Sequence, residues 1–316
     1  MQPISEPKYG PAGTPAGPTT RRQAVDALAK RLTGLYDARE ARNIARLLVS
    51  ERAGIPFAAL LTDPEAELRI EGLEEDIARL ERGVPVQYVI GSAEFYGRRF
   101  TVREGVLIPR PEAEELVDRI VRDERGIRQA EGRTPGGETR RGAEEPWRIL
   151  DVGTGSGCIA ATLALEIPGA ELFAAEIADE ALAVAEENFR RLGARVTLRR
   201  TDALTDLAGQ FPETFDVIVS NPPYVPASDR KAMHPNVRDH EPAVALFVPD
   251  DDPLCFYRAI ARAGRRMLRP GGRLWFEIYE HAAEAMCEML AGEGYTDTEV
   301  YRDLFDKMRM TCSRRK

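Results

Sequence analysis

The chain has 316 residues, 43% of them hydrophobic, which is long enough for two domains with a large buried core. Its formal net charge of −8 weighs against a protein that mainly grips a phosphate backbone, and its apolar runs fall far short of the roughly 18 residues of a membrane span. Because the start lacks a secretory signal and the four cysteines and three histidines have no metal-ligand spacing, we expect a globular cytoplasmic protein without a metal or a membrane partner.

The first part of the chain divides into a tail and a helical region. Residues 1–20 are rich in Pro, Gly and Thr and predict a disordered tail, and residues 21–83 have helical periodicity. Two helices each show one apolar face, the first with Val25, Leu28, Ala29 and Leu32, the second with Ile44, Leu47 and Leu48. We expect a third helix to begin at Asp63-Pro64, an N-cap followed by proline, and to run through Leu80.

The third expected helix is acidic. Between Asp63 and Arg82 the sequence has eight carboxylates against three arginines. Such a surface would repel DNA, although a solvated helix face can have the same composition.

A connector and an insertion follow. Residues 84–108 alternate in polarity around a glycine turn, which predicts a β-hairpin that leads into a second domain, residues 109–316. The segment Leu116 to Val121 has the pattern of a helix end. The charged, glycine-containing residues 122–146 predict a disordered insertion.

A strand, a glycine loop and a helix follow Trp147. The apolar strand ends at Val152 and is followed by Gly153-Thr154-Gly155-Ser156-Gly157. Glycines allow a tight turn and let the backbone approach a ligand closely. The G-x-G-x-G spacing lacks the third glycine position of the dinucleotide fingerprint, which disfavours NAD.

Acidic residues follow the next two strands. One strand ends at Glu176, 19 residues beyond Gly157 (176 − 157), about where an acidic side chain accepts ribose hydroxyls. The next, within "RVTLRRTDA", ends at Asp202, suitably placed for an adenine amino group. Either acid alone could belong to a solvated surface. The ordered set of strand ends indicates a nucleotide-type site at the carboxyl edge of a parallel sheet.

A fourth strand, residues 215–219, must stop at Ser220, because prolines cannot continue a hydrogen-bonded ladder. It leads into Asn221-Pro222-Pro223-Tyr224. This tetrad is either a strand-terminating loop or part of a site. In the second case the Asn221 side-chain oxygen and the Pro222 carbonyl would accept both protons of a substrate NH₂ group, and Tyr224 would stack on its flat face.

The order of these motifs resembles the seven-stranded S-adenosylmethionine-dependent methyltransferases. The resemblance implies an α/β fold, with a Rossmann-like class I methyltransferase domain preceded by the small helical domain, and S-adenosylmethionine as cofactor. It implies cofactor-binding roles for Gly153, Thr154, Gly155, Ser156, Gly157, Glu176, Asp202, Ala203 and Asn221. The tetrad is similar to that of enzymes that methylate a planar, conjugated nitrogen.

Four further segments narrow the resemblance. They are "LERGVPVQYVIGSAEFYGRRFTVREGVLIPRPEAEELV", "LDVGTGSGCIA", "VSNPPYVP" and "VRDHEPAVALF". From about Leu80 to Arg309 the chain resembles the protein-(glutamine-N5) methyltransferases of the HemK/PrmC family, which modify the Gly-Gly-Gln glutamine of peptide chain release factors. The resemblance implies catalytic roles for Asn221 and Pro222, substrate binding by residues 221–224, and a monomer without direct nucleic-acid contact.

Some alternatives remain open. Arg110, in Ile108-Pro109-Arg110-Pro111, could contact a ligand or pair with a structural carboxylate. The helical domain is the candidate for release-factor recognition, although its helices could simply stabilise the second domain. A ribosomal-protein glutamine methyltransferase, an adenine methyltransferase acting on DNA or RNA, and a non-catalytic binding module are the other functions considered.

Overall fold

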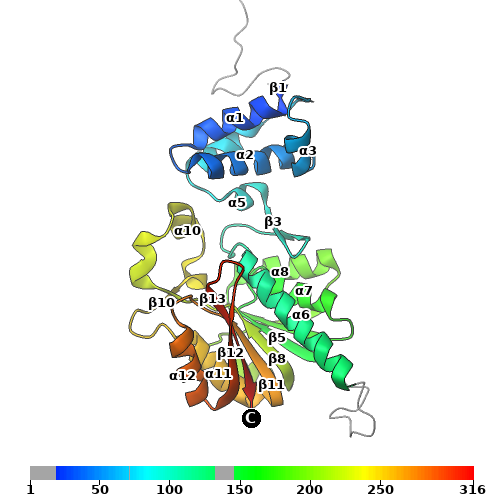
Figure 1. Ribbon diagram of the computed structural model, residues 1–316, viewed down its shortest axis with the longest axis vertical. Coiled ribbons are helices and arrows are strands. Elements are labelled where there is room, and N and C mark those ends of the chain that lie inside the picture. Colours follow the sequence, from blue (N-terminus) through cyan, green and yellow to red (C-terminus); the bar gives the residue numbers. More distant parts are fainter. Residues whose placement is uncertain (1–18, 71, 132–145) are drawn as a thin grey trace, which may run out of the picture. The chain divides into compact units, whose positions relative to one another are not determined.

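The computed structural model describes residues 19–70, 72–131 and 146–316 (Figure 1), without the side chains of residues 125 and 127–131. The chain forms two compact units. Unit 1 comprises the chain up to Gly91 together with His234–His240, and unit 2 comprises the remainder. The boundary expected at residue 83 therefore moves to Gly91, and a segment distant in sequence joins the helical unit. Within the described ranges, no helix is long and apolar enough to cross a membrane.

Unit 1 is built from short helices. These are α1 (Arg21–Leu32), α2 (Ala38–Ala53), α3 (Phe57–Thr62), α4 (Leu73–Glu81), α5 (Val86–Ile90) and α10 (Pro235–His240). The apolar face expected for α1 is confirmed, because Val25, Leu28, Ala29 and Leu32 are buried. The face expected for α2 is only partly correct: Ile44 and Leu48 are buried, but Leu47 is 39% exposed.

The start of unit 1 corrects the extent of the expected tail. Thr19–Thr20 forms strand β1, which pairs with β2 (Glu67–Leu68). Thr20 also caps α1: its side chain accepts a hydrogen bond from the Gln23 N–H, and the Gln23 side chain accepts one from the Thr20 N–H. Residues 1–18 of the expected tail lie outside the described residues.

The prediction of a helix that starts at Asp63 is wrong for the residues before Leu73. Asp63 is the C-cap of α3, and proline suits the position just after a helix end. The next helix, α4, begins at Leu73, after Gly72 in the left-handed region at φ 76°. Three of its carboxylates are paired: Arg31 of α1 binds Glu74 and Glu81 at 2.9 and 2.8 Å, and Arg52 of α2 binds Asp76 at 2.6 Å. The acidic helix is thus held in the bundle partly by its charges.

The segment His234–His240 packs within unit 1. The His234 ring stacks on Tyr36, with centroids 5.3 Å apart and 19° between the planes. His240 Nε2 donates a hydrogen bond to the Arg82 carbonyl oxygen at 3.2 Å. Two residues at the ends of the segment therefore attach it to the helical unit.

The expected connector and insertion are both partly helical. Residues 86–90 form α5, which starts after Pro85 and ends at Gly91 in the left-handed region at φ 85°. The hairpin is shorter than expected, β3 (Ser92–Phe95) and β4 (Arg98–Thr101), and belongs to unit 2. Helix α6 (Pro111–Glu131) continues ten residues beyond its expected end at Val121, and Arg273 binds its Asp123 at 2.9 Å. The rest of the expected insertion, residues 132–145, lies outside the described residues.

The seven-stranded sheet of unit 2 has the order β12-β13-β11-β8-β5-β6-β7. Its strands are β5 (Arg148–Val152), β6 (Glu171–Glu176), β7 (Val196–Arg200), β8 (Phe215–Ser220), β11 (Leu268–Glu277), β12 (Tyr295–Arg302) and β13 (Met308–Arg315). All pairs are parallel except those of β13, which is antiparallel to β11 and β12. The order of connection reverses between β5 and β8, where open α/β sheets bind ligands.

Helices cover both faces of the sheet (Figure 1). They include α7 (Cys158–Glu166), α8 (Asp179–Leu192), α9 (Leu207–Gln210), α11 (Cys255–Met267) and α12 (Ala283–Gly292). Alternate strand residues enter two separate cores: Ile149 and Val217 pack with residues of α6 and α7, whereas Leu150 and Ile218 pack with residues of α11 and α12. Small elements follow the tetrad: the strand pair β9 (Val225–Pro226) and β10 (Phe247–Val248), and two 3₁₀ helices, Ala227–Ala232 and Ala243–Ala245.

We predict that Gly157→Ala destabilises unit 2 more than Gly193→Ala. Both glycines are left-handed, at φ 79° and 70°, so each substitution costs about 1–2 kcal/mol of backbone strain. A Cβ at Gly157 would also lie 2.6 Å from Phe189 Cε1, whereas a Cβ at Gly193 would meet no heavy atom within 4 Å. Overpacking should add about 1–3 kcal/mol at Gly157.

Urea unfolding followed by tryptophan fluorescence measures this difference, because Trp147 and Trp275 are the two tryptophans of the chain and both lie in unit 2. Equal unfolding midpoints for the two variants would show that the contact with Phe189 does not constrain position 157.

Candidate functional site

A cavity of about 270 Å³ opens at the carboxyl edge of the unit 2 sheet. It is lined by the ends of β5, β6, β7 and β8 and by residues 105–110. Ten of the residues expected at the site line it: Gly153, Thr154, Gly155, Ser156, Glu176, Asp202, Ala203, Asn221, Pro222 and Pro223. Gly157 and Tyr224 are not among its lining residues.

The glycine loop is attached to the neighbouring strand. The Gly153 and Thr154 N–H groups both donate to the Ala175 carbonyl oxygen, at 2.9 and 3.1 Å. Gly155 is left-handed, at φ 56°, and a Cβ there would have no heavy atom within 4 Å. Because Gly155 lines the cavity, a side chain at this position would enter space that a ligand can use.

The sequence did not predict a role for Asp151, a buried acid that contacts this loop. Asp151 lies in β5 and is fully buried, and its Oδ2 accepts hydrogen bonds from Thr154 Oγ1 at 2.6 Å and from the Ala160 N–H at 3.1 Å. Burial raises the pKa of Asp151 to about 7, against the opposing effect of the bond from Thr154. Asp151 thereby ties the glycine loop to α7. In the sequence, the feature that could have indicated this role is an acidic residue within an apolar strand.

Both expected acids lie near the carboxyl ends of their strands, but only Glu176 ends its strand, because β7 ends at Arg200 and not at Asp202 as expected. Glu176 ends β6, and its Oε2 accepts the Gly155 N–H at 2.9 Å, while Oε1 accepts the N–H groups of Ile177 and Ala178 at 2.8 and 3.0 Å. Asp202 follows the end of β7 by two residues, and its Oδ1 accepts the Leu204 N–H at 2.8 Å. These bonds hold both carboxylates at the cavity.

The tetrad begins where β8 ends. Ser220 Oγ donates to the Val152 carbonyl oxygen at 2.6 Å, joining the end of β8 to that of β5. Asn221 is partly exposed and lines the cavity. Among the residues that the structure describes, its side-chain amide has no hydrogen-bonding partner, so its oxygen is available to a ligand.

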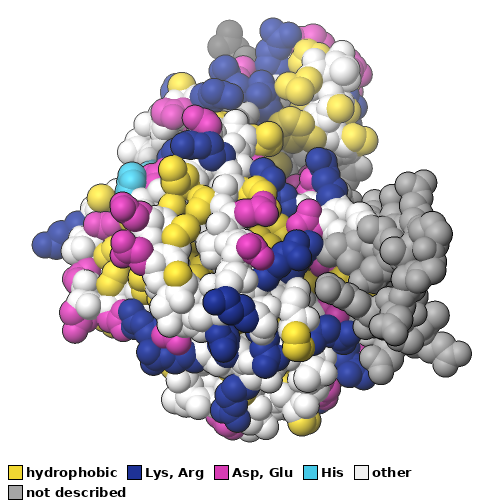
Figure 2. Space-filling view, turned by 60° about the horizontal axis from the view of Figure 1, so that its bottom comes forward, with side chains coloured by type: hydrophobic (Ala, Val, Ile, Leu, Met, Phe, Trp, Pro, Cys, Tyr) yellow, Lys and Arg dark blue, Asp and Glu magenta, His cyan; other side chains and the backbone are white. Residues whose placement is uncertain are grey.

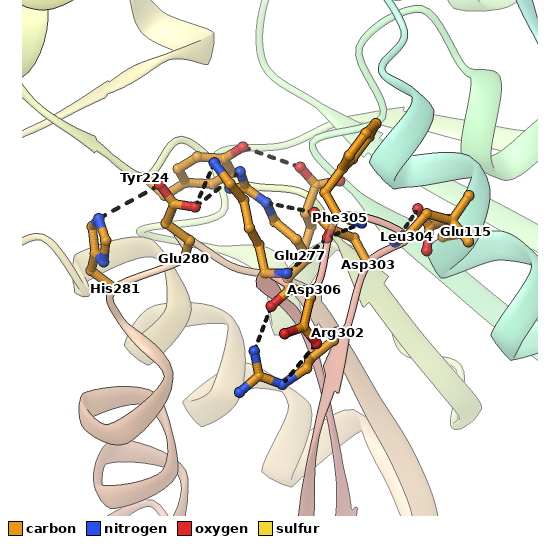
Figure 3. Close-up of polar contacts among 12 residues, drawn as sticks. Glu115, Tyr224, Glu277, Glu280, His281, Arg302, Asp303, Leu304, Phe305 and Asp306 are labelled. Carbon is orange, nitrogen blue, oxygen red and sulfur yellow. Dashed lines mark hydrogen bonds and ion pairs between the residues drawn. The ribbon is translucent and has the colours of Figure 1, made fainter.

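The Tyr224 hydroxyl is directed at Glu277 (Figure 3). Its ring stacks on Tyr279, with centroids 6.1 Å apart and 22° between the planes, and its hydroxyl donates to Glu277 Oε1 at 3.1 Å. Burial and the nearby Glu277 carboxyl raise the pKa of the Tyr224 hydroxyl far above its ordinary value. Glu277 and Tyr279 were not singled out in the sequence, because their partner comes from a distant segment.

Arg110 pairs with a carboxylate and also lines the cavity. Its Nη2 lies 2.6 Å from Oε1 of Glu241, whose side chain is 1% exposed. Glu241 Oε2 accepts the Ile108 N–H at 3.3 Å. The two family-like segments around residues 108–111 and 241–242 are therefore joined by one buried carboxylate.

Comparison with known proteins finds relatives of both units. A family model described as PrmC N-terminal domain matches residues 23–91, and one described as Methyltransferase small domain matches residues 142–238. The chain is 41% identical, over 90% of its length and 96% of the relative, to a release factor glutamine methyltransferase of Bacteroides thetaiotaomicron. An enzyme of the same name from Koribacter versatilis is 36% identical over 94% of this chain and 99% of its own.

A third relative of that name, from Cereibacter sphaeroides, is 37% identical over 93% of this chain and 96% of its own. The matches extend across both units, and the sheet has the seven strands expected of a class I S-adenosylmethionine-dependent methyltransferase. The fold class is thus confirmed. The chain belongs to the family of release factor glutamine methyltransferases.

Proposed function

We propose that the chain transfers a methyl group from S-adenosylmethionine to the side-chain amide nitrogen of the Gly-Gly-Gln glutamine in a peptide chain release factor. One observation carries the proposal beyond the family: the glycine loop, Glu176, Asp202 and the Asn221-Pro222 pair line one cavity. Cofactor and acceptor can therefore meet there. Such a substrate places the reaction in the cytoplasm, and the expected monomer is retained in the proposal.

The cavity fits S-adenosylmethionine. This cofactor has no pyrophosphate, and the open space beside Gly155 suits its methionine moiety. Glu176 would accept the ribose hydroxyls, and Asp202 with Ala203 would hold the adenine side. The carboxylate of Glu176 is held by three N–H groups, so it is already oriented before the ligand binds.

The Asn221-Pro222 pair suits an amide acceptor. An amide nitrogen is a poor nucleophile, because its lone pair is delocalised into the carbonyl group. Asn221 Oδ1 and the Pro222 carbonyl oxygen would each accept a hydrogen bond from one N–H of the glutamine. These bonds would stabilise the positive charge that develops on the nitrogen and would orient the nitrogen toward the methyl group. S-adenosylmethionine, when bound, supplies an electrophilic methyl group on a positively charged sulfur. The amide proton can leave afterwards, so neither residue needs to be a strong base.

The alternative acceptors are less well supported. A ribosomal-protein glutamine methyltransferase would use the same pair of acceptor oxygens, but the relatives described above are named for release factors. An adenine methyltransferase would need a basic surface for nucleic acid. The formal net charge of the chain is −8, and the face shown in Figure 2 carries acidic as well as basic side chains.

Unit 1 is the part of the chain that we propose for release-factor recognition. A glutamine in a Gly-Gly-Gln loop has little surface of its own, so specificity must come from remote contacts. Helix α3 offers such a contact: Phe57 and Leu61, four residues apart on one helix face, are 37% and 53% exposed.

The cofactor assignment predicts that Gly155→Val weakens S-adenosylmethionine binding at least tenfold, because the side chain would enter the cavity. Gly193→Val is the matched control, since Gly193 is also left-handed and open but does not line the cavity. Isothermal titration calorimetry on both folded variants gives the dissociation constants. Parental affinity in Gly155→Val would contradict the assignment.

The acceptor assignment predicts that Asn221→Ala lowers kcat by roughly two to three orders of magnitude, as expected when a preorganised transition-state contact is lost. S-adenosylmethionine affinity should change much less. Tritium transfer to intact release factor, with a ribosomal protein and duplex DNA offered in parallel, measures both rate and acceptor preference. Near-parental turnover in this variant would show that Asn221 is only a loop residue.

The recognition assignment predicts that Phe57→Ser with Leu61→Ser raises KM for intact release factor about tenfold or more, because burial of each side chain contributes about 1.5–3 kcal/mol. Rates on a short Gly-Gly-Gln peptide should stay at parental values, and the melting temperature measures the packing lost from the buried parts of the two side chains. An unchanged KM for the intact protein would exclude this face of α3. Truncation at Gly91 is a poorer test, because it removes the packing partners of His234–His240.

A further inference from the structure

The end of β11 lies beside the end of β8, from which the tetrad leaves the sheet. Ser220 is paired with Phe276, so Asn221, the first residue after β8, follows beside Glu277, the last residue of β11, which is still paired with Met310 of β13. The Tyr224 hydroxyl donates a hydrogen bond to Glu277 Oε1 at 3.1 Å. The backbone pairing and this hydrogen bond together close a ring that contains Asn221, Pro222, Pro223 and Tyr224.

Glu277 is itself held in place. Its backbone carbonyl oxygen accepts the Tyr257 hydroxyl at 3.0 Å, and its residue is 1% exposed. Its Oε2 is buried and has no hydrogen-bonding partner within the described part of the chain. Burial raises the pKa of Glu277 to about 7, with Glu112 acting in the same direction and Tyr224, Arg309 and Arg110 opposing it. A polar group buried in this way is costly unless its remaining hydrogen bond is kept.

Tyr224 has a second restraint on its ring. Tyr279 stacks against it, and the Tyr279 hydroxyl donates to Asp229 Oδ2 at 3.2 Å. Both ends of the Tyr224 side chain are thus fixed, the ring by stacking and the hydroxyl by Glu277. Figure 3 shows the Tyr224 and Glu277 side chains in this cluster.

The tetrad needs such a restraint for a backbone reason. Pro222 and Pro223 have no N–H, so this part of the loop cannot be fixed by backbone donors. The next backbone bond along the chain is from the Val225 N–H to the Leu246 carbonyl oxygen at 2.9 Å. Between the end of β8 and Val225, the bond from Tyr224 to Glu277 therefore supplies a fixed point.

We propose that Glu277 is a positioning residue for methyl transfer, which acts through the Tyr224 hydroxyl to hold Asn221 Oδ1 and the Pro222 carbonyl oxygen in the geometry that receives the substrate amide. The inference rests on the proposed function of this pair. It assigns the Tyr224 hydroxyl to the support of the acceptor site. A displacement of about 1 Å at a reacting group can lower a rate about a hundredfold, so the restraint is large enough to affect kcat.

The kinetic test compares Glu277→Ala, Glu277→Gln and Tyr224→Phe in the full chain. Glu277→Ala and Tyr224→Phe should each lower kcat for intact release factor by about ten- to hundredfold, with S-adenosylmethionine affinity within about threefold of the parent. Glu277→Gln should keep most of the rate, because its amide oxygen still accepts from Tyr224. The double variant Glu277→Ala with Tyr224→Phe should be no slower than the slower single variant, because both remove one bond.

Tyr295→Phe is the matched control for loss of a buried tyrosine hydroxyl. The Tyr295 hydroxyl donates to the Ala261 carbonyl oxygen at 2.8 Å, away from the tetrad. This variant should lose stability comparably to Tyr224→Phe and keep the parental kcat. If Glu277→Ala is poorly folded, Tyr224→Phe still decides the question, because it keeps the ring and its packing.

A second readout does not depend on activity. Hydrogen exchange of a peptide spanning residues 221–226 should be faster in Glu277→Ala and Tyr224→Phe than in the parent, and parental in Glu277→Gln and Tyr295→Phe. If the parental chain does not methylate release factor, the proposed function fails, while the exchange pattern still tests the restraint. Parental kcat and exchange in Tyr224→Phe, or an equal loss in Glu277→Gln and Glu277→Ala, would overturn the positioning role.

Discussion

The parallel pairing of β5 with β8 is the constraint on which the rest of unit 2 depends. It brings the glycine loop and the tetrad to one edge of the sheet, and the hydrogen bond from Ser220 Oγ to the Val152 carbonyl oxygen joins the two strand ends. Neither loop alone could bind both reactants. The glycine loop leaves open space beside its backbone, and the tetrad supplies oxygens that accept hydrogen bonds. Their adjacency creates one cavity in which a cofactor and an amide can meet.

Carboxyl groups hold this edge together from several directions. Asp151 fastens the glycine loop to α7, Glu241 joins Arg110 to the backbone at Ile108, and Glu277 receives Tyr224. All three are buried acids with oxygens directed at N–H or O–H groups of loops. Each makes at least one hydrogen bond to a loop, which offsets part of the cost of burying the acid and favours one loop conformation.

The sequence was sufficient to predict strand ends at the cavity where local pattern decides the structure. Strand ends at Glu176 and Ser220 follow from short apolar runs and from prolines that cannot continue a ladder. It was not sufficient where a distant segment decides: Glu277 and Tyr279, which restrain Tyr224, are more than fifty residues away from it in the sequence. Residues 86–90 and 122–131 are helical despite an alternating and a charged composition, because packing and ion pairs such as Arg273–Asp123 override local preference.

The segment His234–His240 has a consequence for folding during synthesis. Unit 1 contains the chain up to Gly91, yet its remaining segment is completed 149 residues later (240 − 91). At about 5–20 residues per second, the ribosome adds those residues in on the order of ten seconds. During that interval the ring of Tyr36 lacks its stacking partner His234, and four strands of the sheet, β5 to β8, are being made.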